Sequence, residues 1–270
     1  MGMNRRHTRF EVRDGVARLT LARPEIRNAI TDEGMIDEIV SAFVEADRRD
    51  DTTVLVVDAE GPAFSAGGNI KEMRAGTGLF AGGPDEIAEG YRVSIQRLTR
   101  TLLTVDVATV AAVDGPAVGA GFDLVLGCDL RVGSTRARFA HTFVDLGIIP
   151  GDGGAWILPR VVGWQRAAEL AFTARTVDAT EALGMGILLE VVDPDQLASR
   201  VDELATTIAS KPTHSVRLAK RLLRHARTMD LEGFLDLSAG YQAIAHHTEG
   251  HRAAIEAFFA RREARRSTSP

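Results

Sequence analysis

A row of small residues between an apolar run and a helix-like segment constrains the fold of this chain more than any other feature. Residues 111–132 read AAVDGPAVGAGFDLVLGCDLRV. The run 109–113 is short and apolar, which is typical of a buried parallel strand, and the sequence Asp-Gly-Pro at 114–116 must turn the chain. Small residues at 119–121 then precede apolar residues at helical spacing. The pattern predicts a strand, a tight turn and the start of a helix.

The start of this predicted helix is suited to negative charge. Its first backbone N–H groups have no partner within the helix, and the helix dipole gives them positive potential. A phosphate, a carboxylate or an oxygen that becomes negative during a reaction can bind there. Asp123 lies in the same first turn. It is either a catalytic carboxylate or an acid that stabilises the helix start.

A second stretch repeats this design at residues 53–73, which read TVLVVDAEGPAFSAGGNIKEM. A strand-like run at 54–57 leads into a Gly-Pro turn, and the small residues at 64–69 precede a short helix. Each stretch alone also fits a plain tight connection. Together they can direct two backbone N–H groups at one point.

In this order the two stretches resemble those of the crotonase, or enoyl-CoA hydratase/isomerase, family. Residues 64–73 are similar to its FSAGADIKEM-like segment and residues 114–124 to its NGxAxGGGxEL-like segment. The resemblance continues through GIIPGDGG at 147–154 and covers nearly the whole chain. It implies an α/β fold, a ClpP/crotonase-type spiral of ββα units with a helical C-terminal segment.

The resemblance also implies roles for individual residues. The N–H groups of Gly68 and Ala120 match the oxyanion hole that binds the thioester oxygen of an acyl-CoA. Asn69 replaces the Asp of the family motif, at a position that we interpret as structural. The residues that match the substrate-binding positions, where coenzyme A is held largely by backbone atoms, are Ile26, Arg27, Ala66, Gly67, Ile70, Lys71, Gly119 and Phe143.

The acidic residues match the family only in part. Asp123 stands at the first of the two carboxylate positions of the hydratases, but Phe143 stands at the second, and a phenyl ring cannot move a proton. Asp152 resembles the catalytic Asp in the PGDG segment of family hydrolases that cleave cyclic β-diketones. It equally suits an N-cap for the following helix. His141 is expected to be a loop residue rather than a catalyst.

We therefore expect an enzyme that stabilises a thioester enolate and uses Asp123, with Asp152, to transfer a proton or water. Hydration of a 2-enoyl-CoA is the first interpretation, because Asp123 occupies the hydratase-type position. Double-bond isomerisation, which needs one base, and hydrolysis of a C–C bond in a β-diketone are alternatives. A non-catalytic acyl-CoA-binding protein is a fourth. No cofactor or metal is expected apart from the coenzyme A of the substrate.

The composition excludes several other classes of protein. The net charge of −5 argues against a general nucleic-acid-binding surface. The single Cys128 excludes an internal disulfide and a cysteine-based zinc site and fits a reducing compartment. No apolar run approaches the roughly 18 residues of a membrane span. We expect a cytoplasmic protein.

The order of elements predicts one large core and a helical extension. Residues 1–195 are expected to form the core with the acyl-CoA site, and residues 196–270 a helical oligomerisation segment whose apolar content exceeds what isolated helices can bury. The resemblance implies a homotrimer or a dimer of trimers. The Asp-Gly pair at 14–15 predicts a hairpin, residues 85–103 one helix and residues 188–192 a strand. Thr31 is a candidate N-cap for the first long helix.

Overall fold

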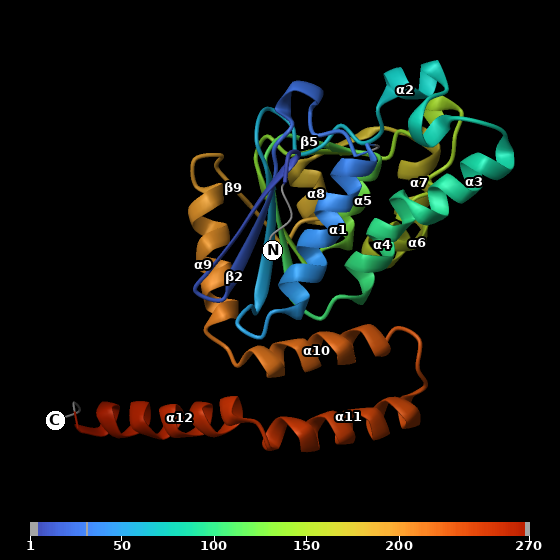
Figure 1. The fold of residues 1–270 in the computed structure, drawn as a ribbon. Helices are drawn as coiled ribbons and strands as arrows, with labels where there is room; N and C mark the ends of the chain where they lie inside the picture. Colours follow the sequence, from blue (N-terminus) through green and yellow to red (C-terminus); the bar gives the residue numbers. More distant parts are fainter. Residues whose placement is uncertain (1–4, 31, 268–270) are drawn as a thin grey trace.

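The computed structural model describes residues 5–30 and 32–267, and in these ranges two β-sheets are packed among helices (Figure 1). The larger sheet has the order β1-β2-β3-β4-β6-β9. β1 and β2 pair antiparallel, and the other neighbours pair parallel. These strands are β1 (Thr8–Arg13), β2 (Val16–Leu21), β3 (Val54–Ala59), β4 (Ala108–Val113), β6 (Leu130–Ser134) and β9 (Glu190–Val192).

The larger sheet is buried on both faces. Leu55 and Val57 of β3 join the main hydrophobic core, which also contains residues of the helices α1 (Glu33–Arg48), α4 (Ile95–Thr104), α5 (Ala120–Gly127) and α6 (Gly154–Val162). The alternate residues Val54 and Val56 face a second cluster under α9 (Leu197–Ala209). Because side chains alternate along a strand, burial on both faces explains the uninterrupted apolar runs of β3 and β4.

The smaller sheet contains β5 (Pro116–Val118), β7 (Arg138–Ala140) and β8 (Thr176–Asp178), in that order. β5 directly follows β4 through the turn at Gly115, which has a φ of 86°. A Cβ at this position would lie 2.4 Å from the carbonyl oxygen of Pro62. The absence of a side chain therefore lets the turn after β4 pack against the loop after β3.

Among the remaining helices, those before α9 are short, and those at the C-terminal end of the chain are longer. They are α2 (Ile70–Ala75), α3 (Pro84–Val93), α7 (Trp164–Thr173), α8 (Ala179–Met185), α10 (Thr213–His225), α11 (Leu231–His246) and α12 (Glu249–Ser267). α10 runs across one end of the body, and α11 and α12 extend below it (Figure 1). Apolar side chains of α11 and α12 are exposed, among them Leu231, Phe258 and Phe259. No helix in the described ranges has the length and apolar character needed to cross a membrane.

The structure confirms the α/β fold of crotonase type with its helical C-terminal region. The hairpin at Asp14-Gly15 is also confirmed, as is a strand at 190–192. The single helix predicted for 85–103 is wrong, because the chain breaks at Ser94 (ψ −100°) between α3 and α4. β8 was not predicted. Thr31 lies outside the described residues, and the side chain of Asp32 caps α1.

Ser65 links the loop after β3 to its neighbours. Its side chain is fully buried, and its Oγ donates to the carbonyl of Asn28 at 2.7 Å and accepts from the N–H of Gly67 at 3.1 Å. Ser65→Ala leaves both partners unsatisfied, so we expect a loss of about 1–3 kcal/mol in the free energy of unfolding. Urea denaturation measures this loss. Ser199→Ala, which removes an exposed hydroxyl, is the control and should leave stability nearly unchanged; equal effects would contradict the structural role of Ser65.

Candidate active site

The two loops of small residues meet at the edge of the sheets. The N–H of Val118 donates to the carbonyl of Ser65 at 2.9 Å. A Cβ on Gly67 would lie 2.4 Å from the carbonyl oxygen of Val118 and 3.2 Å from the backbone nitrogen of Ala120. Within the described residues, neither the N–H of Gly68 nor that of Ala120 has a hydrogen-bond acceptor. The loops therefore bring two unpaired donors into one small region.

A third segment supports the first loop. The N–H of Ala66 donates to the carbonyl of Arg27 at 2.8 Å, and the N–H of Ile30 donates to the carbonyl of Gly67 at 2.8 Å. These bonds bring Arg27, and with it the half-buried Ile26, beside the loop. Arg27 itself is exposed. Four of the predicted coenzyme A positions, residues 26, 27, 66 and 67, thus lie in one contiguous region.

The short helix α2 continues from this loop. Asn69 is its N-cap, and its Oδ1 accepts from the N–H of Lys71 at 3.1 Å. The replacement of the motif's Asp by Asn therefore keeps a capping side chain, in agreement with the structural interpretation. Ile70, which is 61% exposed, and Lys71 present their side chains to solvent.

Asp123 is held inside the molecule at the start of α5. Gly119, with φ 51° and ψ −122°, lets the chain enter the helix, and its carbonyl accepts from the N–H of Asp123 at 3.0 Å. Only 4% of Asp123 is exposed. An Asp that only stabilises a helix start does not need burial, so its environment favours a chemical role.

Asp152 lies next to Asp123, and the loop that carries it is fixed by α4. Gln96 donates to the carbonyl of Gly151 at 2.9 Å, and the hydroxyl of Thr99 donates to the carbonyl of Asp152. Gly153, not Asp152, is the N-cap of α6, so the capping interpretation of Asp152 is wrong. Asp152 is instead 4% exposed and forms a side-chain hydrogen bond with Asp123.

Gly154 determines how closely the two acids approach the backbone. A Cβ at this position would lie 2.1 Å from Oδ1 of Asp123. The missing side chain gives the carboxyl group its place, and the N–H of Gly154 donates to it. The PGDGG sequence thus supplies an acid and the space for its partner.

His141 completes a buried cluster and was not predicted as part of it. Its side chain is 1% exposed, and its Nε2 lies 3.2 Å from Oδ1 of Asp123. His141 lies in a loop, as expected, but the chain after β7 turns its side chain inward between the rings of Phe122 and Phe143. No periodicity in the sequence indicated this, since only the packing of the two sheets buries the position.

The cluster shifts the acidity of all three groups. Burial raises the pKa of Asp123 to about 6, although hydrogen bonds from Asp152 and Gly154 oppose the shift. Burial and the charge of Asp123 raise the pKa of Asp152 well above its usual value. Burial lowers the pKa of His141 to about 4. Near neutral pH, Asp123 is ionised and His141 is neutral, and Asp152 holds its proton to higher pH than an ordinary aspartic acid does.

These charge states give each group a defined hydrogen-bonding role. A neutral His141 beside an ionised Asp123 must donate from Nε2, which fixes its tautomer. Protonated Asp152 can donate to Asp123 as well. The ionised carboxylate of Asp123 is then stabilised by two side-chain donors and one backbone donor.

Phe143 closes one side of this region with an apolar ring. The ring meets His141 edge to face, with centroids 4.8 Å apart. Its edge also lies against Gly119, where a Cβ would be 3.7 Å from Cζ. The second hydratase carboxylate is therefore replaced by a hydrophobic surface beside the oxyanion-type loop. Tyr91 of α3 packs against Gly151 near Asp152.

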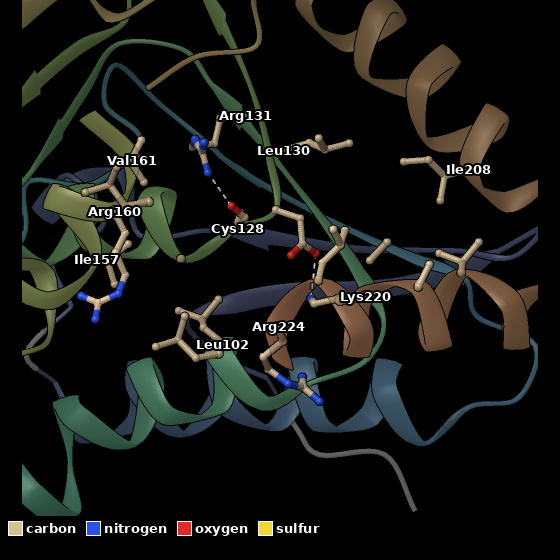
Figure 2. Close-up of a pocket in the computed structure, with 18 of the residues that line it drawn as sticks. Leu102, Cys128, Leu130, Arg131, Ile157, Arg160, Val161, Ile208, Lys220 and Arg224 are labelled. Atoms are coloured by element: carbon tan, nitrogen blue, oxygen red, sulfur yellow. Dashed lines mark hydrogen bonds and ion pairs between the residues drawn. The ribbon is translucent and has the colours of Figure 1, made fainter. Parts of the chain in front are cut away.

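A cavity in the described part of the chain lies away from this cluster. It has a volume of about 780 Å³ and is lined by residues from the far end of α5, including Leu126 and Cys128, and by α10 (Figure 2). Asp123 is not among its lining residues. We place the chemistry at the buried cluster, because titratable groups and unpaired backbone donors meet there. In the described ranges, no group of three or more His, Cys, Asp or Glu has an arrangement that could hold a metal ion.

Comparison with known proteins agrees with this arrangement. The model of the family described as enoyl-CoA hydratase/isomerase matches residues 11–267. The chain belongs to the enoyl-CoA hydratase/isomerase family. Membership makes it an acyl-CoA enzyme of the hydratase/isomerase type.

Individual relatives span nearly the whole chain but differ in reaction. The 1,2-epoxyphenylacetyl-CoA isomerase of Escherichia coli K12 is 34% identical over 93% of this chain and 94% of its own length. The short-chain-enoyl-CoA hydratase of Clostridium acetobutylicum is 31% identical over 92% of each. The crystal structure of a putative enoyl-CoA hydratase from Streptomyces coelicolor A3(2) superposes with a TM-score of 0.89 at 31% identity, covering 97% of this chain and 94% of that one. Family membership alone does not select one reaction.

Ala120 offers a direct test of the oxyanion donors. It is the first residue of α5, where proline is tolerated because the N–H has no partner in the helix. Ala120→Pro deletes this N–H, and we expect kcat to fall by about 10²–10³-fold. Steady-state kinetics with an acyl-CoA substrate measure the effect. Ala120→Gly, which keeps the donor, should retain most of the activity; a fully active, natively folded proline variant would exclude Ala120 as a donor.

Proposed function

We propose that this enzyme shifts the double bond of an enoyl-CoA by proton transfer through Asp123 and Asp152. The observation that supports the proposal is the buried pair of carboxyl groups, in which the pKa of Asp123 is raised to about 6 and the pKa of Asp152 is raised well above its ordinary value. An isomerase needs one group to accept a proton and one to return it. The sequence alone placed hydration first; the geometry favours isomerisation.

The first step would remove a proton from the carbon next to the thioester. Asp123 is the base, because its pKa of about 6 leaves it ionised at neutral pH while keeping useful basicity. The electrons move onto the thioester oxygen, which accepts hydrogen bonds from the N–H groups of Gly68 and Ala120. Preorganised donors of this kind stabilise the enolate without rearranging during the reaction.

The second step would return a proton to the far end of the dienolate. Protonated Asp152 donates to the γ-carbon, and the double bond moves into conjugation with the thioester. Asp123 is then protonated and Asp152 ionised. Transfer of one proton through their hydrogen bond restores the starting state, so no proton is gained or lost in a cycle.

Phe143 is the reason to place hydration second. Addition of water requires a polar site that holds the nucleophile beside the double bond, and an aromatic ring occupies the position of the second hydratase acid. Asp123 at the first hydratase position keeps hydration as the second candidate. The presence of His141 beside Asp123 in the acid cluster keeps C–C hydrolysis of a β-diketone as a weaker candidate.

Two thioesters distinguish these reactions. With a 3-enoyl-CoA, we expect the ultraviolet absorbance of the conjugated 2-enoyl-CoA to appear, and with crotonyl-CoA we expect little loss of absorbance. Asp123→Asn and Asp152→Asn should each reduce isomerisation by at least about 10²-fold, because each removes a proton-transfer group. Asp145→Asn, which changes an exposed acid in the same segment, is the matched control.

Other outcomes of these assays would support a different reaction. Rapid loss of crotonyl-CoA absorbance would establish hydration, and turnover of a cyclic β-diketone would establish hydrolysis. Binding of both thioesters without turnover of any substrate would show a non-catalytic member.

The pH profile tests the assignment of base and acid. Because Asp123 must be ionised, kcat/KM should fall as the pH drops below about 6. His141→Phe removes a donor to the ionised form, so the pKa of Asp123 should rise and this acidic limb should move to higher pH. His141→Gln, whose amide can donate, should move it back. An unchanged limb in a folded, active His141→Phe variant would exclude this positioning role.

Two further proposals concern the oligomeric state of the protein and its cellular compartment. We propose that residues 196–270 contain the oligomerisation segment of a homotrimer or a dimer of trimers, supported by the exposed apolar side chains of α11 and α12. A cytoplasmic location is supported by the single, buried Cys128.

A further inference from the structure

The cavity at the far end of α5 has the size of a small-molecule site. Its volume of about 780 Å³ falls within the roughly 300–1,000 Å³ that is usual for such sites. It lies between the body and α10: Figure 2 shows Ile157 and Arg160 of α6 on one side of the space and Lys220 and Arg224 of α10 on another. Because the catalytic acids do not line it, it calls for a separate explanation.

The walls of the cavity are mainly apolar. They come from five helices and from the start of β4 and β6, and they form a continuous surface rather than isolated side chains. The apolar lining residues include Leu102, Leu103, Leu126, Ile157, Val161, Ile208, Val216 and Leu223. Leu223 is 74% exposed, so the cavity leaves apolar surface in contact with water. An apolar ligand would remove this surface from water.

The charges around the cavity have one predominant sign. Its lining contains six basic residues and one acid, Asp129, although the whole chain carries a net charge of −5. The basic residues are Arg131, Arg160, Lys211, Lys220, Arg224 and Arg227. This excess of positive charge attracts an anion and disfavours a cation.

Three of these basic groups are already engaged. Lys220 pairs with Asp129 at 2.7 Å, Arg224 pairs with Asp106 at 2.9 Å, and Arg131 donates to backbone carbonyl groups. They hold α10 and β6 in place. The charges of these three residues are therefore used in contacts that stabilise the fold.

The other three basic groups have no acidic partner in the described part of the chain. Arg160 and Arg227 lie over the ring of Trp156, at 3.8 and 5.5 Å from its centroid, whereas Lys211 stands between α9 and α10, at the opposite end of α10 from Arg227. Stacking on an aromatic ring orients a guanidinium group but leaves its charge uncompensated. Arg160 and Arg227 can therefore bind an anionic head group.

We propose that this cavity binds a fatty acid, with its chain along the apolar walls and its carboxylate at Arg160 and Arg227. A single chain with one anionic end matches a space whose apolar walls adjoin this pair of cations. The proposal is independent of the proposed isomerisation. Bound between α10 and the body, the fatty acid would stabilise the folded enzyme in proportion to its occupancy.

Binding of dodecanoate to the full-length protein, below its micelle concentration, tests the proposal. We expect saturable binding in calorimetry and a rise in Tm with ligand concentration. Dodecyltrimethylammonium, which has the same chain and the opposite charge, should not bind. Saturating coenzyme A should not displace dodecanoate, because the two sites are separate.

Two pairs of variants locate the site. Thr207→Trp places a ring in the cavity and should weaken binding at least tenfold, whereas Thr206→Trp, on the same helix but outside the lining, should not. Arg160→Glu with Arg227→Glu should also weaken it at least tenfold. The charge-matched control Arg13→Glu with Arg48→Glu, at exposed positions, should leave it unchanged.

Four results would overturn the proposal. One is the absence of saturable binding of dodecanoate. A second is a change in the oligomeric state of Thr207→Trp, which would show that a second copy of the chain fills the cavity. A third is displacement of dodecanoate by coenzyme A, which would place dodecanoate in the catalytic site. The fourth is equal binding by the cationic amphiphile.

Discussion

The burial of two carboxyl groups against each other is the constraint on which the site depends. Two ionised carboxylates at such proximity, away from water, would be strongly unfavourable, so one of them must keep its proton. The surrounding residues reflect this requirement. Gly154 gives Asp123 space and a backbone donor, α4 fixes the loop of Asp152, and His141 donates to the ionised partner. A pair that differs in charge at neutral pH is equipped to accept one proton and supply another.

The same burial affects stability, and the two kinds of group act in opposite directions. The pKa of Asp123 is raised from 3.8 to about 6, so the stability conferred by its protonated form is present below about pH 4 and is lost as the pH rises through 6. The pKa of His141 is lowered from 6.5 to about 4, so stability is lost as the pH falls through this range. The cluster thus costs stability at any pH for the sake of its chemistry, as is common at functional sites.

Local signals in the sequence were sufficient to predict the hairpin and the strand-to-helix loops of the fold. Turns at Gly15 and Gly115 require a positive φ that glycine adopts readily, so the hairpin and the strand-to-helix loops could be recognised from the residues themselves. Asp123 and Asp152 were found because each follows glycines in a recognisable motif. Their role as a hydrogen-bonded pair was not predicted, because it depends on α5 and α6 meeting in space.

What the sequence did not reveal depends on tertiary packing. His141 belongs to the cluster only because β7 carries it between two aromatic rings, and a lone His after a short strand gives no local sign of this. The break at Ser94 between α3 and α4 also lacks a proline or glycine at the break itself. The cationic cavity combines residues that lie up to 125 positions apart along the chain, from Leu102 to Arg227, so periodicity could not indicate it.

The protonation of the acid pair can be observed directly by infrared difference spectroscopy of the folded enzyme at neutral pH. The account predicts a band of a protonated carboxylic acid that disappears in Asp152→Asn, and in Asp123→Asn a change in its frequency as the hydrogen bond is altered. If the wild-type enzyme shows no protonated carboxyl group at pH 7, the two acids do not share a proton, and the central claim is contradicted.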